Sequence, residues 1–115
     1  GHPALGATFN LCHSLMLGEE ERIADLLAEA SPHLFVVTVN GADAGAAESS
    51  WTRLIQTLDR GSFDLRPVLR TLRNLGYAGP VAVQGYGLKG EVADNLRRSK
   101  TAWDRLVAGV GGPAR

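Results

Sequence analysis

Residues 58–84, LDRGSFDLRPVLRTLRNLGYAGPVAVQ, combine a loop, an amphipathic helix and a strand in one continuous stretch. Asp64 is a favourable residue for the start of a helix, and Pro67 is tolerated in its first turn. Gly76 suits the left-handed conformation that ends many helices. Between these signals apolar residues recur at helical spacing, namely Leu65, Val68, Leu69, Leu72 and Leu75. The stretch therefore predicts a helix that ends near Gly76 and leads into a strand over residues 80–84.

The same succession of strand, loop and helix extends on both sides of this stretch. Residues 7–9 form a short strand candidate, and an amphipathic helix is expected over residues 19–30. Residues 34–39, LFVVTV, are apolar at nearly every position, which is typical of a parallel strand covered on both faces. A loop follows over residues 40–50, then a short helical turn around residues 51–58.

The last helix is expected over residues 92–107. Its predicted buried residues are Val92, Leu96, Trp103, Leu106 and Val107, and its charged residues are expected on a solvated face. Strands that alternate with helices favour an α/β fold, here three consecutive βα units with parallel strands, in a single domain over residues 1–115.

Composition indicates an ordinary globular domain with one core. The chain has 115 residues, of which 44% are apolar and 21% are charged. Twelve basic and twelve acidic residues cancel, so charge predicts no nucleic-acid partner, and no apolar run is long enough to predict a membrane span. Cys12 is the only cysteine, which excludes an intrachain disulfide. The chain begins at Gly1, so we expect a missing natural start, and the sequence does not predict a localisation.

Polar side chains follow each predicted strand. Asn10 and His13 follow the first strand, Thr38 and Asn40 lie at the end of the second, and Gln84 ends the third. In parallel βα folds functional residues gather where strands end, so these residues are candidates for one site. The alternative is that each of them only caps a strand or bonds a loop.

These residues lie in segments that resemble the xylose-isomerase-like TIM barrels, which include sugar isomerases, sugar epimerases and endonuclease IV. NLCH (residues 10–13) has the spacing of that family's Asp-x-x-His motif, and VVTVNGAD (residues 36–43) resembles the next strand. Residues 58–84 follow the family's plan of loop, helix and strand. The resemblance covers almost the whole chain and implies a partial domain, the last three units of a (βα)8 barrel, with the N-terminal part absent.

The resemblance also implies a site in which metal ligands are replaced. Asn10 stands where the family has Asp, Thr38 where it has His, and Gln84 where it has Glu. Active members hold a divalent metal such as Mn²⁺ or Mg²⁺, which neutral amides and hydroxyls bind poorly. We therefore predict no metal site and no cofactor here. His13 remains the one titratable group and is the candidate catalytic residue.

Further candidates for substrate contact are Asn40, Gln56 and Arg60, although a loop arginine is more often an ordinary surface residue. Trp51 either lines a sugar pocket or only packs its loop. Residues 85–90, GYGLKG, precede a helix and could hold the phosphate of a sugar.

Two functions of different class remain open. The first is a protein similar to sugar or sugar-phosphate isomerases and epimerases, with a degenerate metal site, and whether it is an enzyme is left open. The second is a non-catalytic module on the same fold that binds carbohydrate or protein. The expected partner is a small sugar or sugar phosphate, and we expect a homo-oligomer or pairing with the missing N-terminal half, because three strands leave open sheet edges.

Overall fold

The structure, a computed structural model, describes residues 2–111 as a three-stranded parallel sheet with helices. The elements in chain order are β1 (Ala7–Asn10), α1 (Leu11–Met16), a 3-10 turn (Glu20–Arg22), α2 (Ile23–Ala30), a second 3-10 turn (Ser31–His33), β2 (Leu34–Val39), α3 (Trp51–Leu54), α4 (Arg66–Asn74), β3 (Val81–Val83) and α5 (Val92–Gly109). Among residues 2–111 no helix combines the length and the apolar character needed to cross a bilayer.

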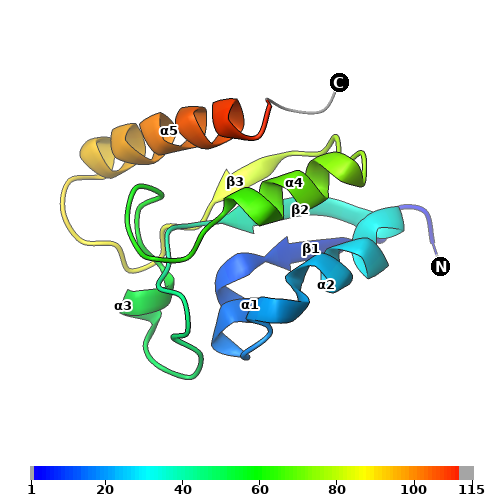
Figure 1. The fold of residues 1–115 in the computed structure, drawn as a ribbon, viewed down its shortest axis with the longest axis horizontal. Coiled ribbons are helices and arrows are strands. Elements are labelled where there is room, and N and C mark those ends of the chain that lie inside the picture. The colour runs from blue at the N-terminus through cyan, green and yellow to red at the C-terminus, as the bar shows by residue number, and fades with distance from the viewer. Residues whose placement is uncertain (1, 112–115) are drawn as a thin grey trace.

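The strands lie in the order β1-β2-β3, each beside its neighbour in the sequence (Figure 1). Both pairs are parallel, with Thr8 opposite Val36 and Val37 opposite Val81. Since connections between parallel strands are right-handed, a consecutive order places the connecting helices on one face of the sheet. The predicted α/β fold with three parallel strands is confirmed.

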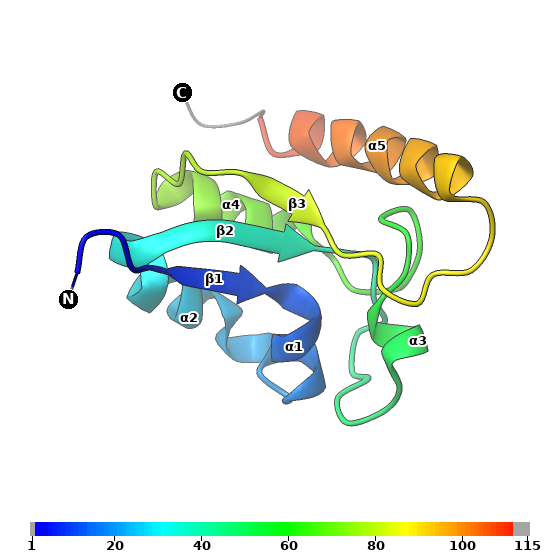
Figure 2. The same ribbon diagram turned by 180° about the vertical axis from the view of Figure 1, so that it is seen from behind.

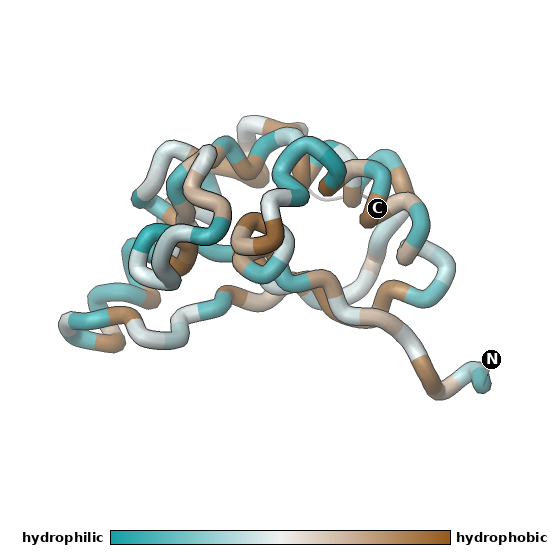
Figure 3. Tube along the Cα trace, turned by 90° about the horizontal axis from the view of Figure 1, so that it is seen from below, coloured by the Kyte–Doolittle hydropathy of each residue, from teal (hydrophilic) through white to brown (hydrophobic). Residues whose placement is uncertain are grey.

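The helices α2 and α4 cover one face of the sheet, and Figure 2 shows them behind the strands. The core lies between these layers and includes Phe9, Val37, Val39, Leu27 and Leu72. Figure 3 shows the N-terminal segment extending away from the rest of the chain, and residues 2–6 are exposed.

The other face of the sheet is not covered by residues 2–111. Thr8 and Ala82 are exposed there, and Val36 and Thr38 are half-buried. The prediction that residues 34–39 are covered on both faces is therefore wrong for the described chain, in which burial alternates along β2. A continuous apolar run on a parallel strand indicates that both faces of the strand favour burial, but helices cover only one face of this sheet within the described residues.

The helix α4 ends as its sequence predicts. Gly76 has a φ of +72°, the Gly76 N–H donates to the Arg73 carbonyl, and the Tyr77 N–H donates to the Leu72 carbonyl. These two bonds form a Schellman motif, which satisfies carbonyls that the end of the helix leaves free. At the other end, the Asp64 carboxylate accepts a hydrogen bond from the Arg66 N–H at 3.0 Å.

Three expectations about the helices need correction. The segment after Asn10, expected as a loop, is the helix α1, whose Leu11 and Leu15 reach the core. The turn expected over residues 51–58 is helical only over Trp51–Leu54. On α5, Val92 and Leu96 are 70% and 59% exposed rather than buried, because the apolar residues of that helix that pack on the core begin at Ala102. Trp103, Leu106 and Val107, also expected to be buried, are half-buried.

The long loop after β2 is closed at its base. Gly41 and Gln56 form an antiparallel bridge, and the Phe63 N–H donates to the Ala42 carbonyl. Gly61 lies against Ala42 with a φ of +86°, and a Cβ atom there would stand 2.0 Å from the Ala42 carbonyl oxygen. Only glycine fits this position, so the loop returns on itself before α4 begins.

Candidate functional site

The carboxyl ends of the three strands bring Asn10, Thr38 and Gln84 to one rim of the sheet. Asn10 lies opposite Thr38 in the β1–β2 pair, and Val39 lies opposite Val83 in the β2–β3 pair. The Gln84 N–H continues this ladder by donating to the Val39 carbonyl at 2.9 Å. Parallel pairing in consecutive order therefore gathers these polar side chains, as the sequence predicts.

Asn10 is the last residue of β1, directly before α1, and is half-buried. Its Oδ1 accepts a hydrogen bond from the Cys12 thiol at 3.2 Å. Cys12 is buried, and burial raises the pKa of its thiol, an effect that outweighs nearby backbone hydrogen bonds. The thiol therefore stays protonated at neutral pH and donates a hydrogen bond to the Asn10 Oδ1 rather than acting as a nucleophile.

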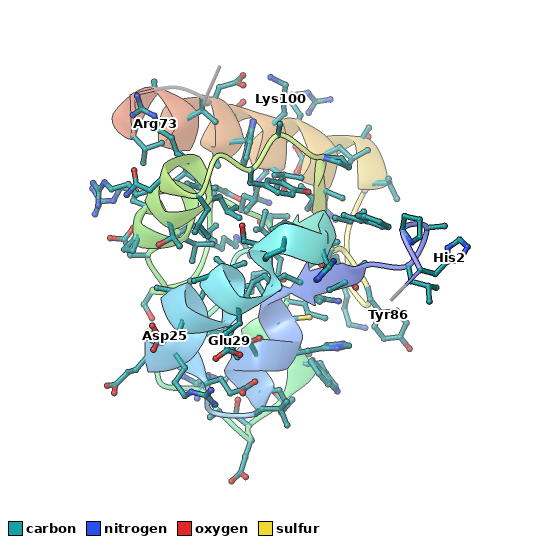
Figure 4. All side chains as sticks on the ribbon, turned by 90° about the vertical axis from the view of Figure 1, so that its right-hand side faces the viewer. His2, Asp25, Glu29, Arg73, Tyr86 and Lys100 are labelled. Carbon is teal, nitrogen blue, oxygen red and sulfur yellow. The ribbon has the colours of Figure 1, made fainter. Side chains whose placement is uncertain are left out.

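Thr38 and Gln84 are half-buried at the same rim. The Thr38 hydroxyl donates to the Phe9 carbonyl at a long 3.5 Å. The Gln84 Oε1 accepts a hydrogen bond from the Tyr86 N–H at 3.1 Å, which holds the start of the next loop. The amide nitrogen of Gln84 has no hydrogen-bond partner within residues 2–111, so it can donate to a bound molecule. Tyr86 itself is 78% exposed and projects outward (Figure 4).

His13 and Trp51 form an aromatic pair. Both side chains are exposed, and their ring centroids lie 5.5 Å apart with the planes tilted by 57°. His13 comes from α1, one turn after Asn10, and Trp51 comes from the start of α3. The pair places a titratable imidazole and an indole face on the same side of the molecule as the rim.

Asn40 is fully buried at the end of β2. Its side-chain amide donates to the Gly41 carbonyl at 2.7 Å and to the Leu54 carbonyl, so it ties the long loop to α3. Its Oδ1 has no hydrogen-bond partner within the described residues. The structure therefore gives Asn40 a role in the loop, and its predicted contact with substrate stays a prediction.

Gln56 and Arg60 lie in the loop that follows α3. The Gln56 amide donates to the Asp43 carboxylate at 3.1 Å and to the Arg53 carbonyl at 2.9 Å. Hydrogen bonds from Gln56 and Arg53 lower the pKa of Asp43, which also pairs with Arg53 at 3.1 Å. This network holds the base of the loop in place beside the Gly41–Gln56 bridge.

Gln56 and Arg60 both line a cavity of about 400 Å³. One wall comes from residues 52–60 and the other from residues 87–98. These segments follow β2 and β3, so the cavity lies at the same end of the sheet as the rim. The predicted site residues thus divide into a rim group and a cavity group.

Sequence reasoning missed Arg98 as a member of this region. Its guanidinium donates to the Asp59 carboxylate at 2.9 Å and to the Thr57 hydroxyl at 3.4 Å. Burial raises the pKa of Asp59, but hydrogen bonds from Thr57 and Arg98 lower it more. Arg98 also lies 3.8 Å from Asp94, one turn earlier on the same helix. From the sequence alone, this nearby partner makes Arg98 look like part of a solvated helix face, which is why its contact with Asp59 was missed.

The rim does not fit the divalent metal that the resemblance implies for active relatives. Within residues 2–111 no three His, Cys, Asp or Glu side chains gather closely enough to hold a metal ion. Asn10, Thr38 and Gln84 offer neutral oxygens, and the amide oxygens of Asn10 and Gln84 already accept hydrogen bonds. Hard cations need anionic oxygens to compensate for lost hydration, so this set of side chains is a poor cation site.

Two comparisons of the sequence with known proteins are negative. No protein-family model matches the chain, and no curated protein matches it significantly.

Proposed function

We propose that this chain belongs to a sugar- or sugar-phosphate-binding protein related to the xylose-isomerase-like isomerases and epimerases, with a degenerate metal site. The observation that carries the proposal is the position of Asn10, Thr38 and Gln84 at one rim, at the carboxyl ends of three consecutive parallel strands. These are the positions at which the resemblance implies Asp, His and Glu.

The topology supports a barrel origin for this sheet. Consecutive parallel strands with connecting helices on one face are expected for successive units of a (βα)8 barrel. A doubly wound sheet would place helices on both faces. In a barrel the open face of the sheet would point to the interior, which agrees with its half-buried Val36 and Thr38.

The chemistry of the rim suits hydroxyl groups better than a metal. Amide and hydroxyl side chains donate and accept hydrogen bonds without a net charge, as sugar hydroxyls do. Trp51, 44% exposed, offers an apolar face beside His13. Neutral amides cannot move protons near pH 7, so any acid–base step would fall to His13.

A non-catalytic interaction module is the second candidate. One face of the sheet lacks a covering layer within residues 2–111, and β1 and β3 each have only one strand neighbour there. Open edges and faces favour association with another chain. In this case the rim would have no catalytic role, and substitution of His13 would change local packing without changing the binding of sugars.

Metal titration separates a degenerate site from an active one. Calorimetry at pH 7 is expected to show no tight Mn²⁺ binding by the wild type. The variant N10D/T38H/Q84E should gain measurable Mn²⁺ affinity, since it restores two carboxylates and an imidazole at the rim. The control N74D/T101H introduces a carboxylate and an imidazole away from the rim and should gain none. Tight Mn²⁺ binding by the wild type that is lost in Q84A would contradict the proposal.

Binding of neutral sugars tests the rim itself. Amide and side-chain NMR signals of Asn10, His13 and Gln84 should shift when aldoses and ketoses are titrated, and N10A/Q84A should abolish the shifts. The control N74A removes an amide on α4 far from the rim. If no sugar in such a panel perturbs the rim signals, the second candidate is favoured.

A further inference from the structure

We propose that the cavity between residues 52–60 and 87–98 binds the phosphate group of a phosphorylated sugar. The sugar part of this inference rests on the proposed function. The phosphate part adds a separate anion site with its own residues.

The cavity has the size and position of a small-ligand site. Its volume of about 400 Å³ lies within the range of about 300–1,000 Å³ that is common for such sites. Its walls come from two segments that are distant in sequence. The cavity therefore exists only because the loop after β2 and the start of α5 lie side by side, and the bond from Arg98 to Asp59 joins them.

Two cations in the lining are available to a ligand. Arg60 and Lys89 both line the cavity, one from each wall, and both are exposed. Within residues 2–111 neither side chain forms an ion pair. Unpaired cations, one on each wall, suit a compact anion with several oxygens.

The remaining charges leave a small positive excess. Arg98 pairs with Asp59 at 2.9 Å and lies 3.8 Å from Asp94, which also pairs with Arg97 at 3.2 Å. Glu91 is the other acidic residue of the lining. The charges of Arg97 and Arg98 balance those of Asp59 and Asp94. The charges that remain are the two cations Arg60 and Lys89 and the one carboxylate Glu91, so cations are in excess by one.

Neutral groups hold the segment of Lys89 in place. The Asn95 amide donates to the Lys89 carbonyl at 3.1 Å, which fastens the loop to the first turn of α5. Gly87 and Gly90 flank Lys89 with φ values of +75° and +93°, a conformation that other residues rarely adopt. The position of Lys89 is therefore set by its neighbours rather than by a long flexible loop.

The cavity adjoins the rim, which favours a phosphorylated sugar over free phosphate. Gln84 bonds Tyr86 at the rim, and Gly87 of the next turn lines the cavity. On the other wall Gln56 lines the cavity and bridges Gly41, the neighbour of Asn40. A polyanion such as nucleic acid is disfavoured, because the chain has no net charge and the cations surround a cavity rather than form a stripe.

Calorimetric titration with inorganic phosphate tests the anion site without reference to any sugar. Wild type should bind phosphate, and R60A/K89A should weaken binding about tenfold or more, since two charge-assisted contacts are lost. The control R70A/K100A removes two exposed cations from α4 and α5 outside the cavity and should bind like wild type. Circular dichroism checks that all three proteins keep the same fold.

The outcomes separate this inference from the proposed function. Equal phosphate affinity of wild type and R60A/K89A, or no phosphate binding by wild type, would overturn the anion site. Phosphate binding that depends on Arg60 and Lys89 supports it. Glucose 6-phosphate, fructose 6-phosphate and ribose 5-phosphate are then compared with phosphate. If none binds more tightly and N10A/Q84A has no effect, the anion site stands and the sugar-binding proposal fails.

Discussion

Removal of the Ser99 hydroxyl should lower the free energy of unfolding by more than the loss of one small group suggests, because this hydroxyl holds α5 on the rest of the chain. Ser99 is the only buried residue described on this helix, and its Oγ accepts a hydrogen bond from the Leu58 N–H at 3.2 Å. Leu58 is itself buried, so S99A leaves a backbone donor without a partner and without access to water. The bond lies between residues 41 positions apart and joins the loop after α3 to α5.

The cost follows from the buried donor. An unsatisfied buried N–H costs about 1–3 kcal/mol, a large part of the roughly 5–15 kcal/mol that stabilises a typical domain. For a chain of this size, each kcal/mol lowers the melting temperature by roughly 3–6 °C. We therefore expect S99A to melt about 3–18 °C below wild type and to lower the free energy of unfolding without a large change in the urea m-value.

The control is T101A on the same helix. Thr101 is exposed and its side chain forms no hydrogen bond within residues 2–111, so its removal should change stability little. Urea unfolding followed by circular dichroism compares the three proteins. Hydrogen exchange adds a local measurement, since amides of α5 and of residues 57–60 should exchange faster in S99A. Identical unfolding midpoints for S99A and T101A would refute the argument that this bond anchors the helix.

Two further predictions concern acid and association. Hydrogen bonds lower the pKa of Asp59 in the folded chain, so the contribution of this carboxylate to stability is complete above the usual aspartate pKa of about 3.9 and is lost as pH falls through the lower folded value. Urea midpoints measured from pH 5 to pH 2 should therefore fall less steeply in D59N than in wild type. Parallel curves for the two proteins would contradict this prediction. Because the sheet has two open edges and one open face within residues 2–111, the isolated chain should form dimers or larger oligomers at micromolar concentration in light scattering coupled to size exclusion, and a compact monomer would contradict the prediction.

The sequence predicts the parts of the fold that local chemistry determines. The helix ending at Gly76 is predictable because the capping signals and the apolar spacing agree. The meeting of Asn10, Thr38 and Gln84 is predictable because parallel strands in consecutive order bring equivalent ends together.

The remaining features depend on contacts that no local pattern records. The helix α1 has six residues, too few for its periodicity to be recognised before the core is known. Periodicity on α5 identifies an apolar face, but it does not show that Val92 and Leu96 lack a covering layer. The Arg98–Asp59 pair spans 39 positions in the sequence, and the nearby Asp94 offers a simpler partner.

The consecutive strand order also bears on how the chain reaches its fold during synthesis. β1, α2 and β2 are complete before any residue of α4 or β3 is made, and β1 pairs with β2. Domains generally fold as units from the N-terminal side during translation, and here each new strand has its partner edge already in place. A ribosome-bound chain that ends after β2 would present that edge to the strand that emerges next.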